Sequence, residues 1–389
     1  MRLSSLFAYG FRSHFLLAGV AALCLVPLWA SNVVWNTPFG SGWPPILWHG
    51  HEMLFGFIAC AIAGFLLTSV PSWTGRKGFA GRPLVVLAGL WIAARLLIAS
   101  SAAWPLYLIA VADLAFLPAL GFLIAPPLLR ERNRNAPLLL ILTLIWCSDL
   151  AFYVGLSRND SPFALHAIHV GIDIVLILVT VIGGRIIPAF TAAALRPSGL
   201  QDRVQSRRAL TLLAIGAMSL VAISDVFGAG ARATGVVAGV AACIQALRLL
   251  QWGGLWTLRQ PIVWVLHVSY AWLPLGLALK ATALLTGAAF GAFWLHALTI
   301  GALTTMILAV MTRAALGHTG RRLIVDPLIT LAYLLLTAAA AVRVFGVSLH
   351  LNYSVVILWS ALLWSTAFAL YLVVYAPILW SPRVDGKPG

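Results

Sequence analysis

Titratable side chains stand at the beginning of an apolar stretch near the start of the chain. The stretch runs from residue 46 to residue 70, long enough to cross a bilayer, and it holds His49, His51 and Glu52 near its first end. Ionisable groups inside such a stretch are costly, so their presence indicates a functional site. Because imidazole suits copper, iron and zinc, the pattern predicts metal or haem chemistry within the membrane.

Two further apolar stretches begin in the same way. His166 and His169 lie near the start of residues 163–182, and His296 lies near the start of residues 289–311. At a rise of 1.5 Å per residue, His51 and His296 lie about 8 and about 10 Å below the ends of their helices. We therefore expect the five histidines in one cluster in the outer leaflet. His267, which begins a stretch from the other side, is the exception.

Helical spacing limits which of these side chains can act together. His166 and His169, three residues apart, share a helical face and can bind one metal ion. A ligating histidine usually donates its second ring N–H to a carboxylate, and three acids within the apolar stretches of this chain are candidates for that role. The acids are Glu52, Asp149 and Asp173. Salt bridges between helices are the alternative role for each acid.

Composition sets the class of protein. Of the 389 residues, 62% are hydrophobic and only 9% are charged, which predicts an all-α polytopic membrane protein. We expect one transmembrane domain over residues 1–389. Twelve stretches can span a membrane, at residues 15–30, 46–70, 83–100, 105–129, 137–156, 163–182, 209–227, 233–250, 262–285, 289–311, 327–345 and 353–380.

The basic residues predict the topology. Of the 25 Lys and Arg, 20 fall in segments on the side of the N-terminus, four fall on the other side, and Arg95 lies within the third stretch. This asymmetry predicts that both termini are cytoplasmic, and it explains the net charge of +15 without a nucleic-acid partner. A cleaved signal peptide is the alternative for the first stretch and would leave eleven spans. The four cysteines form no CxxC pair, so no disulfide framework or thiolate site is expected.

The histidine-bearing stretches recur at a regular interval. His51 and His169 are 118 residues apart, His169 and His296 are 127 apart, and each interval holds four helices. This period is consistent with three four-helix units around a pseudo-threefold axis.

Three segments are specific enough to indicate a family. WHGHEMLFGFIACAIAGFLLTSVPSWTGR (48–76), IGGRIIPAFT (182–191) and HALTIGALTTMILAVMTRAALGHTGR (296–321) resemble the signature blocks of the NnrS family. The resemblance covers the whole chain. It implies a bacterial inner-membrane protein that contains haem, expected to be of b type, and copper, and that acts in the response to nitric oxide and nitrosative stress. It does not settle whether the protein is an enzyme. Nitric oxide or another diatomic ligand, membrane lipid and an electron donor are the expected partners.

The four-helix period also resembles the catalytic subunit of haem-copper oxidases and nitric oxide reductases. Ligands there lie on helices two, six, seven and ten of twelve. The seventh stretch of this chain has no histidine and the tenth has one, so a complete oxidase site is not expected.

Depth and resemblance together give a ligand assignment. We predict that the haem is held by axial histidines with arginines near its propionates, since guanidinium pairs well with carboxylate. The predicted haem-binding residues are His51, His296, Arg95 and Arg343. The predicted copper ligands are His166 and His169, with His49 as a third. The choice of His51 over His49 rests on its greater depth.

Two other classes of protein fit part of the pattern. A secondary transporter of a metal ion or a small anion also combines twelve spans with Asp and His inside the bundle. A structural membrane adaptor needs no buried acids or histidines. A haem absorption band would distinguish the first interpretation from both.

Overall fold

The described part of the chain is helical. The computed structural model describes residues 3–38, 41–291 and 293–386, and within them no strand is present. Twelve helical segments are long and apolar enough to cross a membrane, which confirms the all-α polytopic prediction. Arg2 and Lys387, which entered the charge argument, lie outside the described residues.

The spans follow the predicted stretches closely. In chain order they are α2 (Gly10–Trp35); α3 (Pro45–His51), η1 (Glu52–Ile58) and α4 (Ala59–Thr74); α5 (Arg82–Ala99); α6 (Leu106–Leu114) and α7 (Phe116–Arg130); α8 (Leu138–Ser157); α9 (Ser161–Leu195); α10 (Arg208–Val226); α11 (Ala231–Leu250); α12 (Pro261–Thr286); α13 (Trp294–His296), η7 (Ala297–Thr304) and α14 (Thr305–His318); α15 (Pro327–Phe345); and α16 (Tyr353–Trp380).

One predicted boundary is wrong by several turns. The sixth stretch was expected to end at residue 182 in a turn, but α9 continues through Gly183, Gly184 and Pro188 to Leu195. The two glycines bring the helix close to its neighbours, because a Cβ on Gly183 would touch the ring of Tyr270 at 3.4 Å. Packing of this kind keeps glycine and proline inside membrane helices that their propensities alone would end.

The chain folds into two compact units. Unit 1 contains Met1–Gly171, Met311–Leu323 and Phe368–Gly389, and unit 2 contains Ile172–Val310 and Ile324–Ala367. The single transmembrane domain expected from the sequence stays a prediction.

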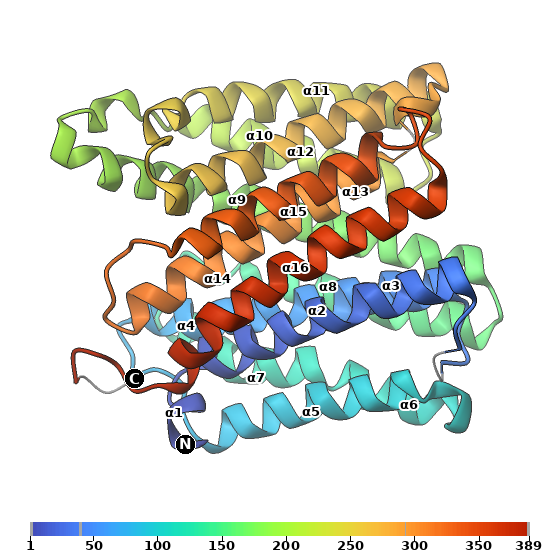
Figure 1. Ribbon diagram of the computed structural model, residues 1–389, viewed down its shortest axis with the longest axis horizontal. Helices are drawn as coiled ribbons and strands as arrows, with labels where there is room; N and C mark the ends of the chain where they lie inside the picture. Colours follow the sequence, from blue (N-terminus) through green and yellow to red (C-terminus); the bar gives the residue numbers. More distant parts are fainter. Residues whose placement is uncertain (1–2, 39–40, 292, 387–389) are drawn as a thin grey trace. The chain divides into compact units, whose positions relative to one another are not determined.

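Small residues let the helices of unit 1 approach closely. Helices α2 and α4 run side by side (Figure 1). At their contact Gly64 faces Phe15, and a Cβ on Gly64 would lie 2.7 Å from that ring. Gly10 is packed against Leu67 in the same way. Lipid gives no hydrophobic drive for helix association, so close packing of this kind supplies much of the attraction.

Unit 2 is built around α12. Helix α11 lies against both α10 and α12, and the three helices lie together in unit 2 (Figure 1). Gly235 of α11 receives the side chain of Leu285, and Gly276 of α12 receives Leu298 from η7. Helix α12 therefore has packed neighbours on more than one face, which accounts for its many buried residues.

The second and tenth spans share a local design. His51 and His296 are each the last residue of a short α-helix, and each is followed at once by a π-helix, η1 or η7. Each π-helix has a glycine five residues after the histidine: Gly56, where a Cβ would lie 2.5 Å from Arg95, and Gly301, where it would meet Trp272. Because π-helical turns are rare and are frequent at functional sites, their recurrence directly after these two histidines marks both positions as candidates for function.

The far ends of these two spans also match. Gly75 and Gly320 each lie 24 residues after their histidine, and both have left-handed φ, 65° and 75°. Glycine is the residue that adopts this conformation without steric cost. The first and third of the three predicted four-helix units thus have corresponding histidine spans, while the pseudo-threefold arrangement itself stays a prediction.

The close contact at Gly64 is testable. We expect Gly64→Ala to lower the free energy of unfolding by about 1–3 kcal/mol, because the added methyl group displaces Phe15. Gly89→Ala on α5 is the matched control, since a Cβ there meets nothing within 4 Å, and it should be neutral or slightly stabilising. Thermal unfolding of the detergent-solubilised protein, followed by tryptophan fluorescence, measures both. Equal midpoints for the two variants would contradict the packing described here.

Candidate functional site

Ionisable side chains from four spans of unit 1 meet at one buried point. Nε2 of His51, at the end of α3, lies 2.9 Å from Oδ2 of Asp113 on α6 and 3.1 Å from Oδ1 of Asp149 on α8. The His51 side chain has no exposed surface, and both carboxylates are buried. We call the group the His51 cluster; its members are His51, Glu52, Arg95, Asp113, Asp149 and Tyr153.

Arg95 supplies the fixed positive charge of the cluster. Its guanidinium pairs with Asp113 and lies 3.3 Å from Oε1 of Glu52. The ring of Trp91 lies beneath it at 5.7 Å. Gly56 has no side chain in the space that the guanidinium occupies, and its carbonyl accepts a hydrogen bond from the Trp91 indole at 3.0 Å. The π-helix η1 and its glycine thus make room for a charge on the neighbouring span.

Aromatic rings surround the imidazole. Phe152, Phe55 and Trp43 lie with their centroids 4.6, 5.1 and 5.3 Å from that of His51. Tyr153 adds a polar contact, because its hydroxyl donates to Oδ2 of Asp113 at 2.9 Å. The rings keep water away, and electrostatic interactions are stronger in such a low-dielectric setting.

The donor set of the cluster fits a divalent cation. One ligand atom each from His51, Asp113 and Asp149 lie within 4.8 Å of one another. With neutral imidazole, three carboxylates and one guanidinium carry a formal charge of −2, which a divalent ion would neutralise. An imidazole with two carboxylates is a donor set for divalent first-row metals. The arrangement can therefore hold a metal ion, or protons in its place.

The other predicted metal ligands of unit 1 lie apart from this group. The ring of His49 stacks on Trp29, with centroids 4.2 Å apart, and so has different neighbours from His51, as their spacing predicts. In α9, His166 is exposed and His169 is partly buried. Among the described residues, His51, Asp113 and Asp149 form the group of three or more ligand side chains close enough to share an ion. Ligation of copper by the other three histidines stays a prediction.

In unit 2 the predicted residues have other neighbours. Arg343 is buried; its guanidinium lies over Phe293 at 5.1 Å and donates to the hydroxyl of Tyr353 at 3.1 Å. Phe293 also lies 6.4 Å from the ring of His296, centroid to centroid. His296 and Arg343 thus share an aromatic neighbour, which is compatible with the predicted placement of both near one haem but does not test it.

A second ion-pair group holds the remaining acid. Lys280 of α12 pairs with Asp225 of α10, and its ammonium lies 4.6 Å from the ring of Trp294. Asp173 is buried beside these two charges. Its surroundings match the interhelical salt-bridge role that the sequence left open. His267 has a hydrogen bond of 2.8 Å with the hydroxyl of Thr191, which fits a structural role.

Two members of the cluster were not among the predicted site residues. Asp113 stands in the apolar stretch of residues 105–129, but nothing in the sequence showed that it faces His51 and Arg95. Nothing in the sequence marked Tyr153 as a member of the site. Asp149 and Glu52 were predicted as partners of a histidine, and both lie beside His51, Glu52 at 3.5 Å from its Nδ1.

Twelve helices long and apolar enough to cross a membrane, counted over the described residues, and a buried, charged centre within unit 1 define a polytopic membrane protein with a candidate site among its helices. The model of the NnrS protein family matches residues 5–383, nearly the whole chain. The chain therefore belongs to the NnrS family, which confirms the resemblance seen in its sequence. Among curated proteins, no relative matches it.

The charge of Arg95 should be essential to the fold of unit 1. We expect Arg95→Ala to cost about 3–5 kcal/mol, because it leaves Glu52 and Asp113 buried without their cation. The control is Arg76→Ala, which breaks an exposed pair with Glu131 at 2.8 Å and should cost about 0–1 kcal/mol. Thermal unfolding in detergent measures both.

A second substitution separates loss of charge balance from loss of packing. Arg95→Ala combined with Asp113→Asn removes one cation and one anion together, so it should recover part of the lost stability. If the double variant is no more stable than Arg95→Ala, the ion pair is not what holds this site together.

Proposed function

We propose that this protein binds haem and copper in the bacterial inner membrane and acts in the response to nitric oxide. It would bind or convert nitric oxide, or another diatomic ligand, at histidines in the outer leaflet, with both termini in the cytoplasm. Membership of the NnrS family supports the proposal. The observation that carries it is the matched pair of His51 and His296, each placed immediately before a π-helix in corresponding spans. Two histidines in equivalent positions suit a paired role, such as axial ligation of one haem.

The carboxylates and rings around His51 limit how it could ligate a haem iron. Nε2 is directed at Asp113 and Asp149, and aromatic rings surround the imidazole, so this ring nitrogen is engaged with carboxylates. Ligation would require the ring to leave both carboxylates. The same atoms fit a divalent first-row ion such as copper(II) or iron(II). The cluster is therefore a second proposed position for the metal, beside the set of His49, His166 and His169.

Single substitutions test the haem assignment. We expect His51→Ala and His296→Ala to lose most of the haem absorbance or to change its spin state, because each removes a proposed axial ligand. His166→Ala and His169→Ala should lose copper and keep the haem band. His350→Ala, on an exposed loop, is the control. Absorption spectra and metal analysis of the purified protein provide the measurement. Loss of haem in His169→Ala but not in His296→Ala would show that the sixth span carries the haem.

The metal content of the acid variants distinguishes the two copper positions. Asp149→Asn keeps the size of the side chain but removes an anionic ligand, so a metal held by the His51 cluster should fall on the order of tenfold in affinity. Asp160→Asn, in an exposed loop, is the matched control. If Asp149→Asn keeps the full metal content while His169→Ala loses it, the metal lies on the sixth span and the cluster does not hold it.

A secondary transporter of a metal ion or a small anion is the second candidate. The His51 cluster favours it, because buried carboxylates paired with Arg and His inside a bundle also mark ion and proton pathways. Such a protein, purified in detergent, would show no Soret band, and in proteoliposomes it would move the ion across the bilayer.

A further inference from the structure

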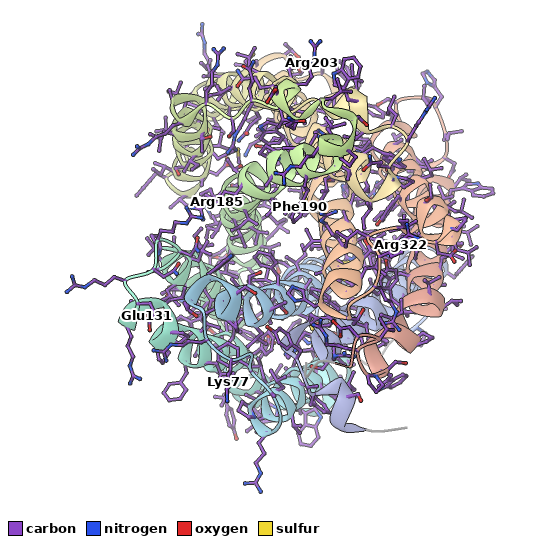
Figure 2. All side chains as sticks on the ribbon, turned by 90° about the vertical axis from the view of Figure 1, so that its left-hand side faces the viewer. Lys77, Glu131, Arg185, Phe190, Arg203 and Arg322 are labelled. Atoms are coloured by element: carbon purple, nitrogen blue, oxygen red, sulfur yellow. The ribbon has the colours of Figure 1, made fainter. Side chains whose placement is uncertain are left out.

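A pocket in unit 2 is lined by positive charge. It has a volume of about 570 Å³ and lies where α9, α10 and their connection meet. Arg185 and Arg208 line it together with the hydroxyl-bearing residues Ser206 and Thr211, and no acidic residue does. Both arginines are exposed. Figure 2 looks onto this end of unit 2, where Arg185 and Arg203 are labelled.

A buried arginine lies directly behind the wall of the pocket. Arg248 of α11 is 2% exposed, and its guanidinium occupies the space that a side chain on Gly184 would fill. Gly184 and Thr211 both line the pocket, and Nη2 of Arg248 lies 3.5 Å from Oγ1 of Thr211. A third cation therefore lies behind the wall of the pocket, in contact with one of its lining side chains.

Arg248 is held by neutral groups alone. Nη1 donates to the carbonyl oxygen of Thr180 at 2.7 Å and to the hydroxyl of Tyr270 at 3.0 Å, and Trp252 lies under the guanidinium at 5.3 Å. Within the described residues no carboxylate pairs with it, and its buried Nε has no hydrogen-bond partner. A buried cation without a counter-charge is costly. Lys280, another cation buried in unit 2, has Asp225 as its partner.

The helix that begins at the pocket adds to the positive field. Helix α10 starts at Arg208 and has 19 residues, with no acidic side chain in its first turn and no side-chain cap. Its first N–H groups and the positive end of its dipole therefore face the same region as the two arginines.

We propose that this pocket binds a phosphoryl group. Three guanidinium groups, a serine hydroxyl and a helix N-terminus match the charge and the several acceptor oxygens of a phosphate. The group can come from the headgroup of an anionic phospholipid or from a soluble phosphate compound. The apolar side chains of Pro188 and Leu212 in the same wall favour the lipid, and basic pockets between membrane helices on the cytoplasmic side are a known mode of headgroup binding. The proposal is independent of haem and copper.

The experiment uses the full chain in detergent, with thermal unfolding followed by tryptophan fluorescence. One arm compares sodium phosphate with sodium chloride at equal ionic strength. The other compares added phosphatidylglycerol with a neutral glycolipid that lacks phosphate. We expect at least one phosphate source to raise the midpoint by about 2–5 °C. Stabilisation by phosphatidylglycerol alone identifies a lipid site, and stabilisation by inorganic phosphate identifies a site for soluble compounds. If neither raises the midpoint, the proposal is wrong.

Variants show whether the effect belongs to the pocket. Arg185→Gln combined with Arg208→Gln changes exposed side chains, so the protein should still fold, and it should bind the phosphoryl group on the order of tenfold more weakly, measured against its own midpoint in chloride. The control combines Arg203→Gln with Arg207→Gln, which removes the same amount of charge from the nearby connection between α9 and α10 without changing a residue that lines the pocket. Equal weakening by both pairs would mean that net charge alone attracts phosphate and would overturn the proposal.

Discussion

The cost of placing charge inside a membrane is the constraint on which this structure depends. The side chain of Arg95 is only 10% exposed, and unit 1 provides two carboxylates for it, Glu52 and Asp113, from two other spans. Those acids in turn need His51 and Tyr153 as partners. The result is a buried network of ion pairs and hydrogen bonds, with aromatic rings around His51. Removing one partner of a buried pair is more damaging than never having had the pair, so the network fixes the positions of four spans relative to one another.

The π-helices connect this network to the chain's internal repetition. An extra residue in a helical turn changes which side chains share a face, and η1 begins at Glu52, directly after His51. The same change follows His296, where alanine stands in place of the glutamate and the close neighbour of the glycine is Trp272 rather than an arginine. The π-helix that follows the histidine therefore has a charged neighbour in unit 1, Arg95, and an aromatic neighbour in unit 2, Trp272.

Two of the buried cations of unit 2 have different kinds of partner. Lys280 forms an ion pair with the carboxylate of Asp225. Arg248 has only neutral acceptors, and it lies behind a wall of the basic pocket, at Gly184. An anion in the pocket would complete its environment from outside the protein. The two proposals rest on different residues. Binding of a metal ion or protons is proposed for the His51 cluster, and binding of an anion is proposed for the basic pocket of unit 2.

Composition and hydropathy determined the class of this protein, because a bilayer admits so few structures that twelve apolar stretches leave little choice. The spacing of His166 and His169 and the position of Glu52 also followed from the sequence, since helical periodicity is local. The end of α9 did not, because Gly183, Gly184 and Pro188 usually stop a helix and are retained only by packing against other spans. Nor could the sequence show that Asp113 lies against His51 from 62 residues away. Pairing between helices depends on how each one is rotated about its axis, and only the tertiary structure decides that.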